Sequence, residues 1–300
     1  MGESKPEIVL SYRGRDLNAG DLDLIRHTIS AHYSRGRSEI ARRLCAQWDW
    51  RQANGKYKEY AARDLLLRLE EAGQIALPPR QRPKNNHKSA DYTQRPLGLC
   101  QRPLSGRVDR FRTWELRPVE GRDERYLWDY LVHHHHYLGR PKLVGEHLKQ
   151  LVWLEDQVVG CLGWASAAWK VACRDAYIGW RAEQRRAHLQ SVVNNVRFLI
   201  LPWVRVEHLA SKALAGSLRA LGRLWSQRFG HAPLLAETFV DPSRFAGTCY
   251  RAANWRRVGQ TRGHAKRGNR YYPHQQPKEV WLYPLHRRWR ERLRGGEPSA

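Results

Sequence analysis

Residues 195–230 have the sequence NVRFLILPWVRVEHLASKALAGSLRALGRLWSQRFG, and this stretch decides the fold class. Residues 195–204 are rich in branched and aromatic side chains, which is typical of a buried strand. Residues 208–230 predict a long amphipathic helix that ends at Gly230, because glycine readily adopts the conformation that terminates helices. A strand that leads into a long helix indicates a mixed α/β domain.

The mixed pattern begins near Trp114 and continues to residue 285. Before the quoted stretch, we expect a helix, a hairpin whose strands are joined by a polar turn, and a further strand, over residues 122–136, 148–168 and 174–180. After it, we expect a strand, a short helix and two more strands, over residues 234–241, 244–255, 256–261 and 279–285.

Residues 17–77 predict a separate helical unit. Leu22, Ile25 and Ile29 mark a first helix with Asp21 as a candidate N-cap, and further helices follow over 38–48 and 56–73. Residues 74–79 (QIALPP) predict a short strand. Three helices and a strand in this order are typical of a winged helix-turn-helix.

The predicted fold class is therefore α+β, with an N-terminal winged helix-turn-helix and a C-terminal mixed α/β domain. The segment between them is rich in Pro, Arg and Asn and has no apolar period, which is typical of a linker. The predicted divisions are 1–77 (winged helix), 78–112 (basic linker), 113–286 (α/β domain) and 287–300 (basic tail).

The charge balance indicates a polyanionic partner. The chain has 53 Lys+Arg against 29 Asp+Glu, a net charge of +24, and a polyanion would relieve the resulting self-repulsion. Arginine dominates, which favours bidentate contacts to phosphates and guanine edges. The five cysteines are widely spaced, which argues against a disulfide framework and a zinc finger. The absence of a long apolar run leads us to expect a cytoplasmic protein without a membrane partner.

The order of elements from residue 122 to 285 is similar to the GNAT acyltransferase fold. In that fold, a glycine-rich loop between the fourth strand and the long helix cradles the pyrophosphate of acetyl-CoA. The corresponding stretch here is PWVRVEHLAS (202–211), which contains no glycine. Without glycine the backbone cannot easily approach a pyrophosphate, so we expect a GNAT-like scaffold that does not bind acetyl-CoA.

A second resemblance covers most of the chain. Six runs carry it: HHYLG (135–139), RDAYIGW (174–180), NVRFLIL (195–201), HLAS (208–211), ETFVD (237–241) and GTCYRAANW (247–255). In this order they resemble the DruA family of the Druantia anti-phage system, whose members also occur in the company of transposases. The resemblance implies a role in defence or in mobile elements, with proteins of those systems as partners. It implies no particular chemistry.

DNA is the expected polyanion. The third helix of the N-terminal unit contributes Lys56, Lys58, Arg63 and Arg68, which suits a recognition helix flanked by phosphate contacts. Winged helices also bind protein, and that alternative stays open. The segment TRGHAKRGNRYY (261–272) suits backbone tracking and base stacking. The other candidate DNA contacts are Arg174, Arg197, Arg262, Lys266, Arg267 and Arg270.

Six residues are candidates for catalysis: His135, His136, Asp175, Glu237, Asp241 and Tyr250. Asp175, Glu237 and His136 would form a carboxylate–histidine site for Mg²⁺ or Mn²⁺, if they converge. Glu237 and Asp241 alone would lie about 13 Å apart along a strand, too far to share one ion. The alternatives are histidines that end a helix, acids paired with Arg174, Arg197 or Arg244, and a core tyrosine.

Three functions stay open at this level. The first is a DNA-binding protein of defence or transposition that cuts or joins DNA with a metal. The second is a GNAT-type acyltransferase that acts on a nucleic-acid-associated target, against which the glycine-free segment speaks. The third is a non-catalytic adaptor that loads a helicase or nuclease onto DNA.

Overall fold

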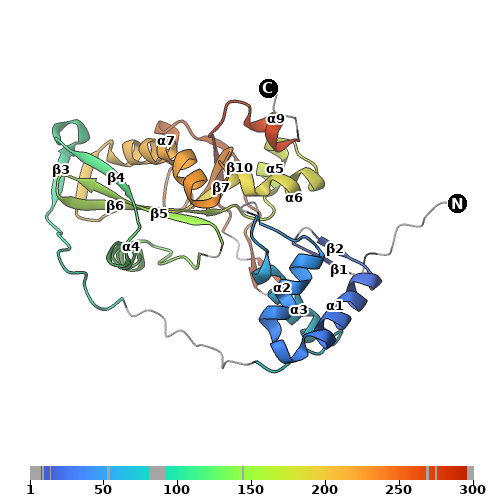
Figure 1. The fold of residues 1–300 in the computed structure, drawn as a ribbon. Helices are drawn as coiled ribbons and strands as arrows, with labels where there is room; N and C mark the ends of the chain where they lie inside the picture. Colours follow the sequence, from blue (N-terminus) through green and yellow to red (C-terminus); the bar gives the residue numbers. More distant parts are fainter. Residues whose placement is uncertain are drawn as a thin grey trace. The chain divides into compact units, whose positions relative to one another are not determined.

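The computed structural model describes residues 8, 10–13, 15–52, 55–80, 92–143, 145–267, 270–273 and 276–295, with the backbone alone for 264–267 and 270–273. The chain divides into two compact units, residues 1–89 and 90–300, each of which can be followed in Figure 1. No helix in the described part of the chain is both long and apolar enough to cross a membrane.

The first unit consists of a hairpin followed by three helices. These elements are β1 (Leu10–Tyr12), β2 (Arg15–Leu17), α1 (Ala19–Ala31), α2 (Arg37–Gln47) and α3 (Glu59–Glu71). The three predicted helices are confirmed, and their apolar faces form one core around Ile25, Ile40 and Leu65. Asn18, rather than Asp21, is the N-cap of α1, and Asp21 completes a capping box by accepting a hydrogen bond from the Asn18 N–H.

The strand predicted at residues 74–79 is wrong, because this segment has no ladder partner among the described residues. Leu77 donates its N–H to Glu70 Oε1 at 3.2 Å, and Arg37 Nε donates to the carbonyl of Pro78 at 2.7 Å. Pro78 and Pro79 lack the N–H that a strand would use. The first unit instead pairs two strands, β1 and β2, before the helices, where the sequence analysis expected no strands.

The second unit is built on a seven-stranded sheet in the order β10-β13-β9-β7-β6-β5-β4. Its strands are β4 (Trp114–Pro118), β5 (His147–Leu154), β6 (Gln157–Ser166), β7 (Val192–Ile200), β9 (Leu235–Val240), β10 (Arg256–Gln260) and β13 (Glu279–Pro284). Only β7 and β9 pair in parallel within this sheet, from Val192↔Leu235 to Asn195↔Thr238. Beyond that register the two strands have no paired residues. The predicted mixed α/β domain is confirmed.

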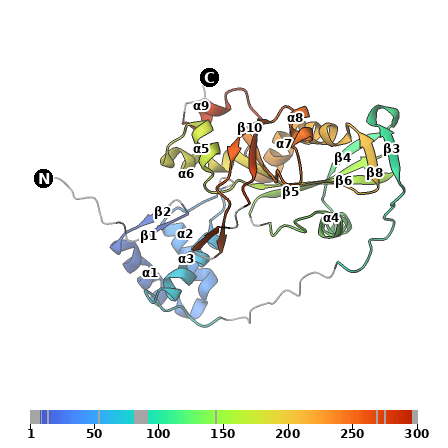
Figure 2. The ribbon, with the colours of Figure 1, turned by 180° about the vertical axis from the view of Figure 1, so that it is seen from behind.

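Two long helices cover the opposite faces of this sheet, α4 (Arg122–His135) and α7 (Leu209–Phe229), as both views show (Figures 1 and 2). Trp128 of α4 is fully buried, and its indole N–H donates to the Leu162 carbonyl of β6 at 3.0 Å. The remaining helices are α5 (Ala172–Ile178), α6 (Ala182–His188), α8 (Thr248–Ala252) and α9 (Trp289–Leu293), the last lying within the predicted basic tail.

The strand predicted at residues 174–180 is wrong, because this run forms α5 and ends at Gly179 in the left-handed conformation (φ 74°). A run of seven residues is too short for periodicity to separate the two structures. Arg174 and Ile178 are four residues apart and are both buried. A strand would also place these two residues on one face, so the local pattern fits both structures. Packing against the rest of the unit therefore selects the helix.

Two short strands join parts of the chain that are far apart in sequence. β3 (Leu104–Arg107) pairs in parallel with β8 (Val204–Glu207). β3 lies within the predicted linker, of which residues 81–91 lie outside the described residues. β8 lies between β7 and α7. The single strand expected over residues 195–204 is interrupted at Pro202, which has no N–H for a strand ladder, and β8 begins after it.

Candidate nucleic-acid interface

The first unit carries a cationic depression made of two shallow hollows that share Tyr57. We call it the α2–α3 groove. Six cations and two carboxylates line it, together with small, aromatic and amide-bearing residues: Arg35, Glu39, Arg42, Arg43, Ala46, Arg51, Gln52, Gly55, Lys56, Tyr57, Glu59, Tyr60 and Arg63. The excess of positive charge suits a polyanion.

Arginine side chains in the groove lie over aromatic rings. The Arg51 guanidinium lies 4.4 Å from the centre of the Tyr57 ring, and that of Arg63 lies 5.0 Å from the Tyr60 ring. Tyr60 is 73% exposed, although it belongs to a helix whose other face is core. Flat guanidinium and aromatic surfaces of this kind contact phosphates and bases in nucleic-acid complexes.

Glu39 organises the α2 side of the groove. Its carboxylate accepts hydrogen bonds from both Arg42 and Arg43, the latter at 2.9 Å. These two bonds hold the pKa of Glu39 below its usual value. One carboxylate therefore orients two exposed cations and leaves a net positive charge at this end of the groove.

Two of the four cations predicted for the third helix, Lys56 and Arg63, line the groove. Lys58 directly precedes α3 and is partly buried, and this burial lowers the pKa of its amine. Arg68 points elsewhere, since it pairs with Asp64 at 3.2 Å and lies 4.9 Å from the Tyr12 ring. The sequence analysis missed Arg35, Arg42, Arg43 and Arg51, because it considered only the third helix; a search for cations on the outer side of the second helix would have found two of them.

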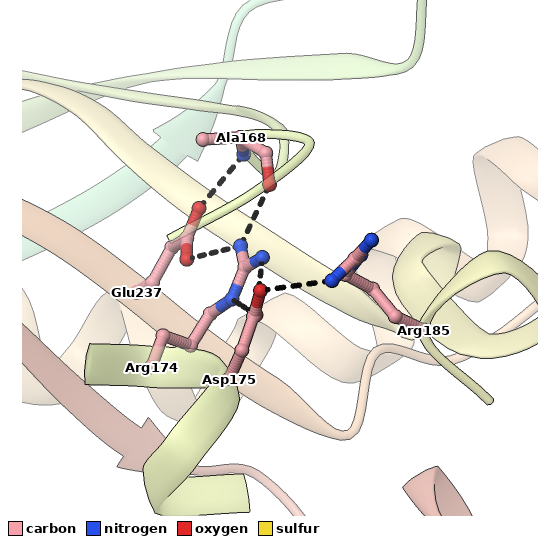
Figure 3. A network of polar contacts seen from close by, with 5 residues as sticks. All are labelled: Ala168, Arg174, Asp175, Arg185 and Glu237. Carbon is pink, nitrogen blue, oxygen red and sulfur yellow. Dashed lines mark hydrogen bonds and ion pairs between the residues drawn. The ribbon is translucent and has the colours of Figure 1, made fainter. Parts of the chain in front are cut away.

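In the second unit, the predicted acids converge on an arginine. Arg174 and Glu237 are fully buried, and Arg174 Nη1 donates to Glu237 Oε2 at 2.8 Å (Figure 3). Glu237 Oε1 accepts the N–H of Ala168 at 2.9 Å, and Arg174 Nη1 donates to the carbonyl of the same residue at 2.7 Å. Asp175 accepts from Arg174 Nη2 at 2.8 Å and from Arg185 at 3.3 Å. We call this cluster the Arg174 clamp.

The clamp corrects two predictions. Arg174 cannot contact DNA, because its side chain is fully buried and engaged by two carboxylates. Among the described residues, no group of three or more His, Cys, Asp and Glu side chains could hold a metal ion. The metal site predicted from Asp175, Glu237 and His136 is therefore wrong, and the cation between the two acids is a guanidinium. Burial raises the pKa of Glu237, and the charge of Arg174 opposes that rise.

Tyr250 lies where β7 and β9 diverge and is buried. Its hydroxyl donates to Asn195 Oδ1 at 3.0 Å, and its ring packs edge-to-face against Trp255 and Phe198. Burial raises the pKa of the phenol further above its usual value. A buried phenol with a satisfied hydroxyl cannot attack a phosphodiester, so Tyr250 has the position of a core residue rather than of a nucleophile.

The histidine run ends α4. His134 Nε2 lies 2.7 Å from the carbonyl of Tyr92, and the His135 ring packs against Trp203. His136 follows the helix and accepts the N–H of Leu138 on Nδ1 at 3.1 Å. Burial, Arg197 and Lys278 together lower the pKa of His136 to about 4.

The other predicted residues of the second unit are dispersed. Arg197 donates to the carbonyls of Gly139 and Leu138 at 2.7 and 3.3 Å. Asp241 follows β9 and accepts the N–H and the hydroxyl of Ser243. Arg262 is exposed. The side chains of Lys266, Arg267 and Arg270 lie outside the described residues.

Three solved structures illustrate the similarities found for this chain. An acetyltransferase of the GNAT family from Streptococcus pneumoniae aligns with a TM-score of 0.38 at 12% identity, over 58% of this chain and 100% of the other. An acetyltransferase from Bacillus subtilis in complex with CoA gives 0.38 at 7%, over 58% and 100%. The ribosomal-protein-S18-alanine N-acetyltransferase from Escherichia coli gives 0.36 at 9%, over 58% and 94%.

A comparison with curated proteins gives no match. A comparison with protein families matches the model described as Druantia protein DruA to residues 68–269. This match includes most of the second unit and the end of α3. Because it spans about two thirds of the 300 residues, the chain belongs to the DruA family.

Proposed function

We propose that this protein binds double-stranded DNA through the α2–α3 groove and acts in Druantia-type anti-phage defence. The observation that carries the DNA part is the groove itself, in which six cations outnumber two carboxylates. The family supports the defence part. The net charge of +24 is consistent with a partner that neutralises it.

The arrangement of α2 and α3 suits recognition of a duplex. The inner face of α3 is fixed in the core by Leu65, Leu66 and Leu69, so its outer face is presented on a rigid support. We propose that Tyr60 and Arg63, which belong to that outer face, contact base edges. Arg42 and Arg43 of α2 then contact phosphates, as in proteins that use a helix-turn-helix. The winged helix-turn-helix interpretation of this unit is part of the proposal.

We propose binding rather than metal-dependent cleavage as the role of this chain. The acids expected to hold a metal are engaged by Arg174 instead. An acyltransferase is not favoured either, because the segment that would cradle a pyrophosphate forms strand β8. This leaves an adaptor that recognises DNA for other proteins of the system.

The test measures the affinity of the full chain for a labelled duplex by fluorescence anisotropy at several salt concentrations. The double variant Arg42→Ala/Arg43→Ala should bind more weakly, with a salt slope reduced by about 0.9 for each phosphate that is no longer neutralised. Arg26→Ala is the matched control, since Arg26 is exposed in the same unit, pairs with Asp23 and lies outside the groove. Equal duplex affinity for the double variant and the control would refute the assignment to the groove.

A further inference from the structure

Three of the large apolar side chains exposed in the second unit lie together. Tyr137 and Leu138 follow α4 and are 37% and 45% exposed, and Phe245 follows β9 and is 51% exposed. The centres of the Tyr137 and Phe245 rings are 5.5 Å apart. Two loops from different parts of the chain thus form one aromatic surface, which we call the Tyr137–Phe245 platform.

Partly buried polar groups hold both loops of the platform in place. Arg197 of β7 donates to the carbonyls of Leu138 and Gly139, and burial lowers the pKa of its guanidinium. Asp241, at the end of β9, accepts the N–H of Ser243 at 3.1 Å and its hydroxyl at 2.6 Å. The platform is therefore anchored to the central strands of the sheet while its rings remain exposed. A fixed, exposed aromatic surface is suited to binding rather than to stability.

Ring stacking already occurs at this site. The His136 ring stacks on Tyr137 with an interplanar angle of 26° and 4.9 Å between ring centres. The Arg244 guanidinium lies 5.1 Å from the centre of the Tyr137 ring. Among the described residues, Phe245 has its ring contact with Tyr137 and keeps about half of its surface open.

The charges around the platform favour an anion. Three cations, Arg197, Arg244 and Lys278, and one carboxylate, Asp241, affect the pKa values of His136 and Tyr137. Arg244 is 58% exposed and lies 3.9 Å from Asp241. Lys278 is partly buried, and this burial lowers the pKa of its amine, which Asp241 opposes. An occupant of this site should therefore combine a flat apolar ring with negative charge.

We propose that the Tyr137–Phe245 platform binds an unpaired nucleotide of single-stranded DNA, with the base stacked on Phe245 and Tyr137 and the phosphate at Arg244 and Lys278. A base in a duplex is stacked on both faces, whereas an unpaired base offers its ring to an aromatic side chain. The inference rests on the proposed function in that the partner is DNA, but it uses residues of the second unit only. The groove and the platform would then contact paired and unpaired DNA, respectively.

The experiment compares the full-length protein and its variants for binding of a fluorescein-labelled oligothymidylate and of a duplex of equal length. Tyr137→Ala/Phe245→Ala should weaken binding of the oligothymidylate by about 10-fold or more and leave duplex affinity unchanged. Tyr137→Phe keeps the ring and should bind like the wild type. Leu97→Ala is the control, because Leu97 is a fully exposed apolar residue of the same unit that is not one of the three residues of the platform.

A second readout separates stacking from charge. An abasic strand of the same length should bind the wild type about as weakly as the double variant binds the oligothymidylate, because neither complex contains the base–ring contact. Phe245→Leu retains apolar volume at an exposed position and keeps the protein folded, and it should also weaken binding of the oligothymidylate.

The outcomes distinguish this inference from the proposed function. Unchanged oligothymidylate affinity in both Phe245→Leu and the double variant overturns the inference, whatever the groove variants do. The inference is also overturned if an oligouridylate binds more tightly than the oligothymidylate, or if an apolar peptide that competes with the oligothymidylate binds more tightly than it. Loss of duplex binding in Arg42→Ala/Arg43→Ala with retained binding of the single strand supports the platform as a separate site.

Discussion

Replacement of Glu237 by glutamine tests whether the Arg174 clamp is an ion pair that stabilises the second unit. The carbonyl oxygen of the introduced side chain could still accept the N–H of Ala168. Its amide nitrogen, however, would face the donor Nη1 of Arg174, which now lies 2.8 Å from a carboxylate oxygen. Arg174 would keep only Asp175 as a charged partner, while remaining fully buried.

The expected loss in the free energy of unfolding is about 3 kcal/mol. Breaking a buried pair costs roughly 3–5 kcal/mol because one charge is left uncompensated, and the remaining bond to Asp175 places this case at the lower end. With a urea dependence of about 2–3 kcal/mol per molar, the unfolding midpoint should fall by about 1 M.

Tryptophan fluorescence during urea denaturation follows the second unit, because eleven of the 13 tryptophans lie beyond residue 89. Glu115→Gln is the control. Its carboxylate is 53% exposed and pairs with Arg117 at the surface, and the loss of an exposed pair should leave the midpoint unchanged.

A loss below about 1 kcal/mol in Glu237→Gln would refute the reasoning, since it would mean that burial keeps Glu237 protonated and that Arg174 relies on Asp175. A Glu237→Gln protein of normal stability that has lost a metal-dependent activity would refute it as well.

Further expectations concern helix α7, His136 and acetyl-CoA. Gly216→Ala should lower stability by about 1–3 kcal/mol, because its Cβ would lie 2.4 Å from the ring of Trp114. In the same helix, the Cβ of Gly222→Ala would meet nothing within 4 Å, so this variant should raise stability by up to about 1 kcal/mol. Urea denaturation that shows the same sign of change for both variants would contradict this expectation. The folded state lowers the pKa of His136 from 6.5 to about 4, so the neutral ring's contribution to the free energy of unfolding is present above pH 6.5 and is lost as the pH falls toward 4. The wild type should therefore lose about 2 kcal/mol of stability through His136 between pH 7.5 and pH 5, and His136→Asn should not show this loss. Identical pH dependence of wild type and variant would contradict the assignment. Calorimetry should detect no binding of acetyl-CoA, because residues 202–211 contain no glycine that would let the backbone approach a pyrophosphate, and micromolar affinity would restore the acyltransferase hypothesis.

Periodicity along the chain was sufficient to predict the elements whose neighbours are local. The three helices of the first unit, the β5–β6 hairpin and the succession of β7 and α7 follow from apolar spacing and from glycines such as Gly73 and Gly230. The cationic character of the protein follows from composition alone. These features depend on side chains a few residues apart, which a single sequence displays directly.

Tertiary structure decided the pairing of β3 with β8, the helical form of α5 and the partners of each charged residue. Glu237 and Arg174 are 63 residues apart and meet because α5 packs against β10 and β13, and β13 is the neighbour of β9 in the sheet. Tyr137 and Phe245 likewise share a surface only because two loops are anchored to neighbouring strands. Whether a charge is buried, paired or exposed depends on which elements meet, and the energy that selects those contacts comes from packing across the whole unit rather than from local sequence.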